Sequence, residues 1–65
     1  GEANTLDIFL TDANGRVIRQ LRKGEFYNRG TNMIHFDAGP LNSGIYFLVV
    51  KGKSLTHTEK IQIIK

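Results

Sequence analysis

Apolar and polar side chains alternate along most of this 65-residue chain, and that alternation restricts its fold more than any other feature. In TLDIFLTD, for example, Leu6, Ile8 and Leu10 take every second position, as expected for a β-strand with one apolar face. No ten-residue window shows sustained helical spacing. The pattern therefore predicts an all-β fold, a small antiparallel β-sandwich or barrel.

Turn-forming residues divide this pattern into five expected strands, at residues 5–12, 16–23, 31–37, 45–51 and 55–65. The stretches GEFYNRGTN and AGPLNSG are expected to be connections. Within residues 16–23 the apolar positions are unevenly spaced, which indicates either a bulge or an edge strand with its basic side chains outward. Residues 45–51 are apolar on both faces, which favours a central strand.

The stretch DANGR lies between the first two expected strands. DANG resembles the first residues of a calcium-binding loop. In such a loop a third oxygen ligand precedes the glycine, but here Gly15 follows Asn14 directly, so the third ligand position is missing. Asn and Gly tolerate the positive φ that tight hairpin turns require. The better interpretation is therefore a structural turn formed by Asp12, Asn14, Gly15 and Arg16.

The size and composition of the chain bear on its function class. A chain this short buries only about 60% of the surface that it exposes when unfolded, which leaves little free energy for an elaborate catalytic cleft. We therefore expect no enzymatic activity, no catalytic residue and no cofactor. The absence of cysteine excludes a disulfide framework and cysteine-type zinc sites. The beginning, GEANT, lacks the blocks of a signal peptide, so an exported protein would carry that signal elsewhere.

The remaining candidates for chemistry are two histidines and two serines. His35 and His57 are not spaced as zinc ligands, and the chain has no second ligand cluster, so we expect no metal site. Ser43 and Ser54 have no assigned base and no nucleophile elbow around them. A turn-capping role is the better interpretation of Ser43.

The net charge of +3 is unevenly distributed. Two basic groups stand out: Arg16, Arg19, Arg22, Lys23 and Arg29, then Lys51, Lys53, Lys60 and Lys65. They could form a solvated strand surface or attract an anionic partner. Together with Phe26, Tyr27 and Phe47, the basic residues could also form a surface that binds single-stranded nucleic acid. Because the aromatic residues mostly alternate with aliphatic ones, as core residues do, we expect no nucleic-acid partner.

The chain ends on EKIQIIK, a strand-like apolar run. Terminal segments usually fray unless contacts hold them. Ile61, Ile63 and Ile64 near the last residue therefore indicate that this end is paired in a sheet or used in recognition.

Read together, four stretches make the chain resemble the C-terminal sorting domain of type IX secretion cargo in Bacteroidetes-type bacteria. They are LDIFLTDANGRVIRQL, GTNMIHFD, LNSGIYFLVVK and HTEKIQIIK. In that family an apolar strand ends in Asp before a Gly-Arg turn, a Ser-Gly-aliphatic-Tyr-Phe strand follows, and the terminal strand opens and ends with Lys. The matching positions are Asp12, Gly15, Arg16, the SGIYF block at residues 43–47, Lys60 and Lys65.

The resemblance implies a domain organisation. Residues 1–4 would be a linker or cloning remnant, and residues 5–65 an Ig-like C-terminal sorting domain with an antiparallel β-sandwich fold. The family usually begins with a Pro-Asn-Pro stretch and an additional strand, and neither precedes Thr5. Either the fragment starts after that strand or this member lacks it. An edge left uncovered in this way would favour an edge-paired or domain-swapped homodimer.

The resemblance also implies a function. Domains of this family follow a larger cargo protein, act as a non-catalytic secretion signal, and are recognised by the outer-membrane translocon and its shuttle. A sortase-like peptidase then commonly removes them. The implied route runs through the periplasm to the outer membrane and cell surface, or to secretion.

The recognition region is expected near the carboxyl end. Its predicted residues are Gly44, Tyr46, Lys60, Ile61, Ile63, Ile64 and Lys65. Part of this signal is structural, since Gly44 and Tyr46 could be needed only for the sandwich to form.

Two other function classes remain open. A structural module similar to the Ig-like domain of flagellar hook-capping proteins shares the GR turn and the SGIYF-like strand. An adhesive or carbohydrate-binding accessory domain would need exposed aromatic residues on one flat face, and Phe26 and Tyr27 barely supply them.

Overall fold

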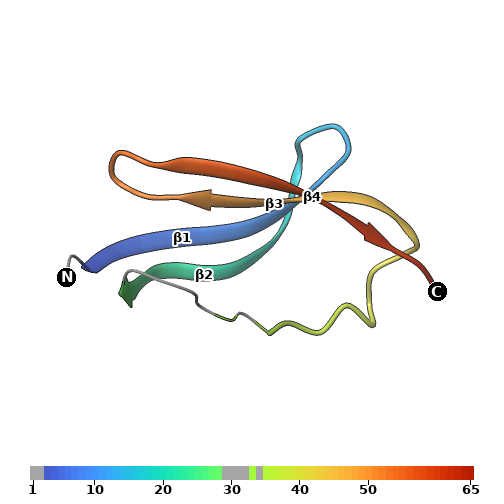
Figure 1. The fold of residues 1–65 in the computed structure, drawn as a ribbon. Coiled ribbons are helices and arrows are strands. Elements are labelled where there is room, and N and C mark those ends of the chain that lie inside the picture. Colours follow the sequence, from blue (N-terminus) through green and yellow to red (C-terminus); the bar gives the residue numbers. More distant parts are fainter. Residues whose placement is uncertain (1–2, 29–32, 34) are drawn as a thin grey trace.

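The computed structural model describes residues 3–28, 33 and 35–65, which form four strands and no helix (Figure 1). The strands are β1 (Ala3–Asp12), β2 (Val17–Asn28), β3 (Gly44–Lys51) and β4 (Thr56–Ile63). They form one sheet in the order β2-β1-β3-β4, and every neighbouring pair is antiparallel. The predicted all-β antiparallel fold class is confirmed. Among the described residues there is no helix that could cross a membrane.

The core is built on β1, a central strand. Residues directly opposite one another in an antiparallel pair point to the same face of the sheet, and Leu10 lies opposite Leu48 while Ile8 lies opposite Val50. Ile8 is 1% exposed and Leu10 is 0% exposed, so both are fully buried. We call the face that carries Ile8 and Leu10 the inner face, and the face that carries Phe9 the outer face.

The connection between β2 and β3 covers the inner face. Arg19 and Arg22 of β2 lie opposite the two buried residues of β1, so they share that face. Arg19 donates a hydrogen bond to the backbone carbonyl of Asp37, and Arg22 donates to that of His35 over 3.2 Å. Figure 1 shows the described part of this connection, residues 35–43, running along one side of the sheet. A segment that is not a strand is therefore bound to the face that carries the core.

Tyr46 fixes the far end of this connection. Its side chain is buried on the inner face, and its hydroxyl donates to the backbone carbonyl of Asn42 over 2.6 Å. A tyrosine near the start of a strand that bonds back to the backbone just upstream resembles the tyrosine corner of Ig-like sandwiches. The contact is consistent with the Ig-like class that the sequence predicts.

Asp12 organises the turn between β1 and β2. Its Oδ1 accepts the backbone N–H groups of Asn14 and Arg16, each over 2.9 Å. The N–H of Gly15 also donates to the Asp12 carbonyl over 3.0 Å, and the N–H of Asp12 donates to the Arg16 carbonyl over 2.9 Å. One carboxylate therefore ends β1 and holds the turn that starts β2.

β2 continues through residues 24–28, where the sequence predicts a connection. A bulge makes this possible: the register with β1 shifts between Leu6 and Ile8, and Gly24 takes a φ of 62°, which favours glycine. The N–H of Gly24 donates to Asp7 Oδ1 over 2.7 Å. Both explanations of the uneven spacing in this strand apply, because β2 is bulged and also lies at an edge.

The prediction of a strand at residues 31–37 is wrong for its described part. Met33 and residues 35–37 have no strand conformation, while Thr31, Asn32 and Ile34 lie outside the described residues. The carbonyls of His35 and Asp37 accept hydrogen bonds from arginine side chains instead of from a neighbouring strand. The described part of the chain consequently holds four strands, not five.

Candidate recognition site at the carboxyl end

The pairing of β3 with β4 brings together residues that are far apart in the sequence. Gly44 lies opposite Ile63 and Tyr46 lies opposite Ile61, so these positions share the inner face. Lys60 directly precedes Ile61 in β4, and successive side chains of a strand point to opposite faces, so Lys60 points to the outer face. The seven predicted recognition residues therefore do not form one continuous face.

The last residue is bound to the connection that covers the core. The backbone N–H of Lys65 donates to Ser43 Oγ over 3.0 Å, and the Lys65 ammonium donates to the backbone carbonyl of Gly39. Asp37 Oδ1 accepts the N–H of Gly39 over 2.9 Å, which supports the turn that presents this carbonyl. The end of the chain is thus held by two contacts beyond the limit of β4.

Exposure divides the predicted residues into two groups. Ile61 and Ile63 are partly buried, whereas Ile64 is 79% exposed and Lys60 is exposed. Ile64 and Lys60 are therefore accessible to solvent, whereas Ile61 and Ile63 are packed in part within the domain.

Gly44 has a backbone requirement. Its φ is 159°, in a range that residues with a Cβ rarely adopt. A Cβ at this position would meet Tyr46 Cε2 at 3.9 Å, which is an ordinary contact, so backbone conformation and not space favours glycine. Gly44 therefore sets how the chain enters β3 and where Tyr46 lies.

Three residues that hold this end were missed by the sequence reasoning: Gly39, Asn42 and Ser43. The sequence suggested that Ser43 caps a turn, but it accepts the N–H of Lys65, a residue 22 positions away. Gly39 binds the Lys65 side chain across 26 positions. Contacts over such separations leave no periodic signal, so only the folded chain reveals them.

Comparison with known proteins identifies the family. The model of the family described as "Secretion system C-terminal sorting domain" matches residues 2–65. The chain belongs to this family. No curated protein and no solved structure matches it.

The sorting domain is accordingly a C-terminal signal for type IX secretion. Its partners are of two kinds, a cargo protein and the type IX secretion machinery, and its destination is the cell surface or the medium, across the outer membrane. The family match favours this function over the flagellar and the adhesive alternatives. Domains of this kind carry targeting information and are generally not catalytic.

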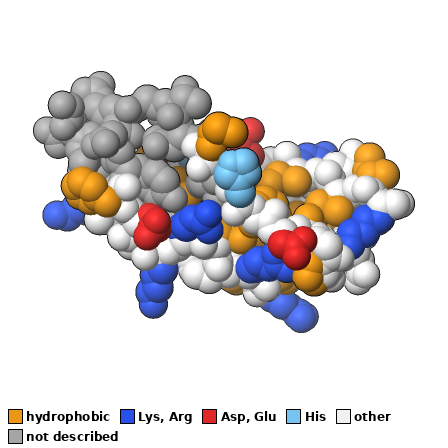
Figure 2. Space-filling view, turned by 90° about the horizontal axis from the view of Figure 1, so that it is seen from below, with side chains coloured by type: hydrophobic (Ala, Val, Ile, Leu, Met, Phe, Trp, Pro, Cys, Tyr) orange, Lys and Arg blue, Asp and Glu red, His pale blue; other side chains and the backbone are white. Residues whose placement is uncertain are grey.

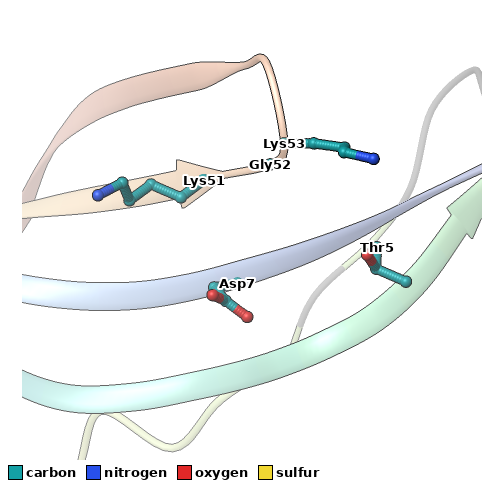
Figure 3. A pocket seen from close by; sticks show the side chains of 5 residues that line it. All are labelled: Thr5, Asp7, Lys51, Gly52 and Lys53. Carbon is teal, nitrogen blue, oxygen red and sulfur yellow. The ribbon is translucent and has the colours of Figure 1, made fainter.

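The sorting domain also has an open depression at the opposite end of β3. It measures about 540 Å³ and is lined by Thr5, Asp7, Lys51, Gly52 and Lys53. In Figure 3 the side chains of Lys51 and Lys53 point in opposite directions. The carboxylate of Asp7 already accepts the N–H of the bulge in β2. The depression therefore gathers no convergent set of groups that could bind one ion or perform catalysis.

The other candidates from the sequence lie apart from the carboxyl end. His57 Nε2 hydrogen-bonds to Glu59 Oε2 over 2.7 Å on β4, whereas His35 is exposed in the connection. Residues 3–28, 33 and 35–65 contain no group of three or more metal-ligating side chains that could hold an ion. Phe26 is exposed on β2, and the side chain of Tyr27 lies outside the described part of the domain.

The basic side chains of the sorting domain have mixed roles. Figure 2 shows the side that carries the connection, where Lys and Arg side chains lie at several separate places among hydrophobic ones. Arg19 and Arg22 bind backbone carbonyls of that connection, so part of the first basic group is structural. Arg29 lies outside the described residues.

Proposed function

We propose that the sorting domain is a folded address tag whose carboxyl end is recognised by the outer-membrane translocon and its shuttle. The recognition region comprises the residues predicted from the sequence: Gly44, Tyr46, Lys60, Ile61, Ile63, Ile64 and Lys65. In this proposal some of them build the site and others touch the receptor.

The building group holds the end of the sheet in place. Gly44 and Tyr46 set the start of β3, and they lie opposite Ile63 and Ile61. The contact group is Lys60, Ile64 and the terminal carboxylate of Lys65. We divide the region by the exposure of its side chains, because a receptor can bind only the side chains that it can reach.

The observation that carries the proposal is the anchoring of Lys65 to Ser43 and Gly39. A free tail would lose conformational entropy when a receptor ordered it, at a cost of about 1 to 2 kcal/mol per residue. An end that is already fixed avoids most of this cost on binding. Ile64, exposed directly before the anchored residue, is therefore presented at a defined position.

An export assay tests the proposal. A reporter enzyme joined to the sorting domain is expressed in a bacterium with type IX secretion, and its activity is measured in the medium, on the surface and in the periplasm. Removal of residues 61–65 should abolish export. Ile64→Asp should reduce export strongly while leaving the fold intact, because this side chain is 79% exposed.

Met33→Asp is the matched control, since Met33 is 77% exposed and lies outside the proposed region. Its export should equal that of the unchanged domain. Normal export of the truncated domain would refute recognition of the terminus. Equal effects of Ile64→Asp and Met33→Asp would refute a specific role for Ile64.

Removal by a sortase-like peptidase is the second part of the proposal. The cargo recovered from the cell surface should be smaller than the cargo from a strain without that peptidase, by at least the 7.3 kDa of this domain. Equal masses in the two strains, measured by mass spectrometry, would contradict removal.

A further inference from the structure

The two edges of the sheet differ in how well they are protected. β2 and β4 each have a single neighbour among the described strands. The register of β2 with β1 is shifted at three places, and such bulges blunt an edge against pairing with another chain. β4 pairs with β3 without any shift from Thr56 to Ile63, and residues 56–60 are all exposed. The edge of β4 is therefore regular and open.

The hairpin between β3 and β4 shows which backbone groups of β4 point outward. The N–H of Gly52 donates to the carbonyl of Leu55 over 2.7 Å, so the backbone of Leu55 points toward β3. Backbone groups of successive residues in a strand point to alternate sides. Thr56, Thr58 and Lys60 consequently direct their N–H and C=O groups away from β3, where no described strand meets them.

We propose that this edge pairs with the β4 of a second copy of the chain, in an antiparallel arrangement centred on Thr58. The outward backbone groups of Thr58 would bond to those of Thr58 of the second copy, and those of Thr56 to Lys60 of the second copy. The two four-stranded sheets would then continue into one. This interaction goes beyond sorting and uses the free edge of β4, which overlaps the proposed recognition region only at Lys60 and Ile61.

Side-chain complementarity selects the register. With the two-fold axis at Thr58, His57 lies opposite Glu59 of the second copy, and the symmetry produces this contact twice. Both side chains are more than half exposed in the single chain, and they already hydrogen-bond within β4. The same register places Leu55, which is 52% exposed, opposite Ile61 of the second copy on the inner face.

Neighbouring registers are less favourable. Moving the axis one residue toward the carboxyl end places Glu59 opposite Glu59 of the second copy, and one residue further places Lys60 opposite Lys60. Like charges directly opposite one another destabilise a strand pair. Moving the axis toward the hairpin shortens the paired segment and sets His57 opposite His57. The register centred on Thr58 avoids all three arrangements.

This pairing uses the backbone of Lys60 and the inner face at Ile61, but it leaves the last residues of the proposed recognition region accessible. The second copy would cover β4 from Leu55 to Ile61, and beyond that point its own hairpin turns away. Ile64 and Lys65 lie past the covered segment. A sorting domain could therefore be dimeric and still present its terminus.

Sedimentation equilibrium of the 65-residue chain tests the proposal. From micromolar to millimolar concentration the chain should show a reversible monomer–dimer equilibrium without larger species. Thr58→Pro should abolish the dimer, because it removes an outward N–H and proline is tolerated where that N–H faces away from the sheet. Glu59→Lys should raise the dissociation constant about tenfold, because the contact with His57 occurs twice.

A double variant that changes both His57 and Glu59 provides a more specific control. His57→Glu combined with Glu59→Lys places Glu opposite Lys across the pair, so the dissociation constant should return to near the original value. Glu25→Lys makes the same charge change on β2, and its dissociation constant should not move. Circular dichroism and the urea midpoint of dilute samples establish that each variant remains folded.

Three results would overturn the inference. They are a strictly monomeric chain over the whole range, a dimer that Glu59→Lys and Thr58→Pro do not weaken, and an open series of larger polymers. None of these results bears on the export assay, so failure of the dimer and failure of terminal recognition can be told apart.

Discussion

Leu10 lies at the middle of β1 with no exposed surface, so its replacement by alanine tests how far the fold depends on a very small core. The substitution removes buried methyl groups between Arg19 on one neighbouring strand and Leu48 on the other. Loss of transfer free energy and the cavity left behind together cost about 2 to 5 kcal/mol in such sites. We expect about 3 kcal/mol, because the connection over the inner face can partly collapse onto the space.

This cost is large relative to the whole domain. At roughly 0.05 to 0.15 kcal/mol per residue, 65 residues correspond to a free energy of unfolding of about 3 to 10 kcal/mol. Leu10→Ala should therefore remove about 30% of the stability or more. Since 1 kcal/mol shifts the Tm of a domain this small by about 4 to 8 °C, the Tm should fall by about 12 to 24 °C.

Urea unfolding followed by circular dichroism measures the effect directly. Leu55→Ala is the matched control, because it is the same chemical change at a residue that is 52% exposed. At concentrations where the chain is monomeric it should cost less than about 0.5 kcal/mol. Equal destabilisation by the two variants would refute the view that the inner face of β1 is the core. In the export assay, Leu10→Ala should also fail at a temperature where it is unfolded.

Two further substitutions test individual hydrogen bonds, again by urea unfolding. Tyr46→Phe removes the hydroxyl that donates to the Asn42 carbonyl and should cost about 1 kcal/mol; a change within experimental error would show that this contact does not hold the connection. Asp12→Ala removes the acceptor for two N–H groups in the first turn and should cost about 1 to 2 kcal/mol, whereas Asp12→Asn keeps an acceptor oxygen and should cost less. An equal loss for both Asp12 variants would contradict the capping role.

Local patterns predicted β1, β3 and β4 because alternation is a property of neighbouring residues. The extension of β2 escaped prediction, since it depends on the Asp7 carboxylate binding the N–H of Gly24, 17 positions away. The expected strand at residues 31–37 failed in its described part for a related reason. Arginine side chains of β2 satisfy the carbonyls of His35 and Asp37, and alternation alone does not reveal that competition.

The candidate site was likewise predicted only in part. Motif resemblance pointed to Gly44, Tyr46 and the terminal isoleucines, and the register places Gly44 opposite Ile63 and Tyr46 opposite Ile61. Of the two residues that anchor the terminus, Gly39 belongs to no motif, and Ser43 belongs to the SGIYF block but was expected to cap a turn. They matter only because the connection returns over the inner face and meets the end of β4.

By itself the sequence determined that the chain is all-β, that Leu6, Ile8 and Leu10 share one face of the first strand, where the first turn lies and to which family the motifs belong. The central position of β3 was also predicted from its apolar character on both faces, and the edge position of β2 was one of two predicted alternatives. Tertiary structure alone decided that β1 is inside the sheet, that β4 is the other edge, and that Lys65 is bound to the connection. The physical reason is that side-chain alternation specifies a face, whereas backbone hydrogen bonds between strands are nearly independent of residue type. Which strand pairs with which is therefore settled by packing across the whole domain.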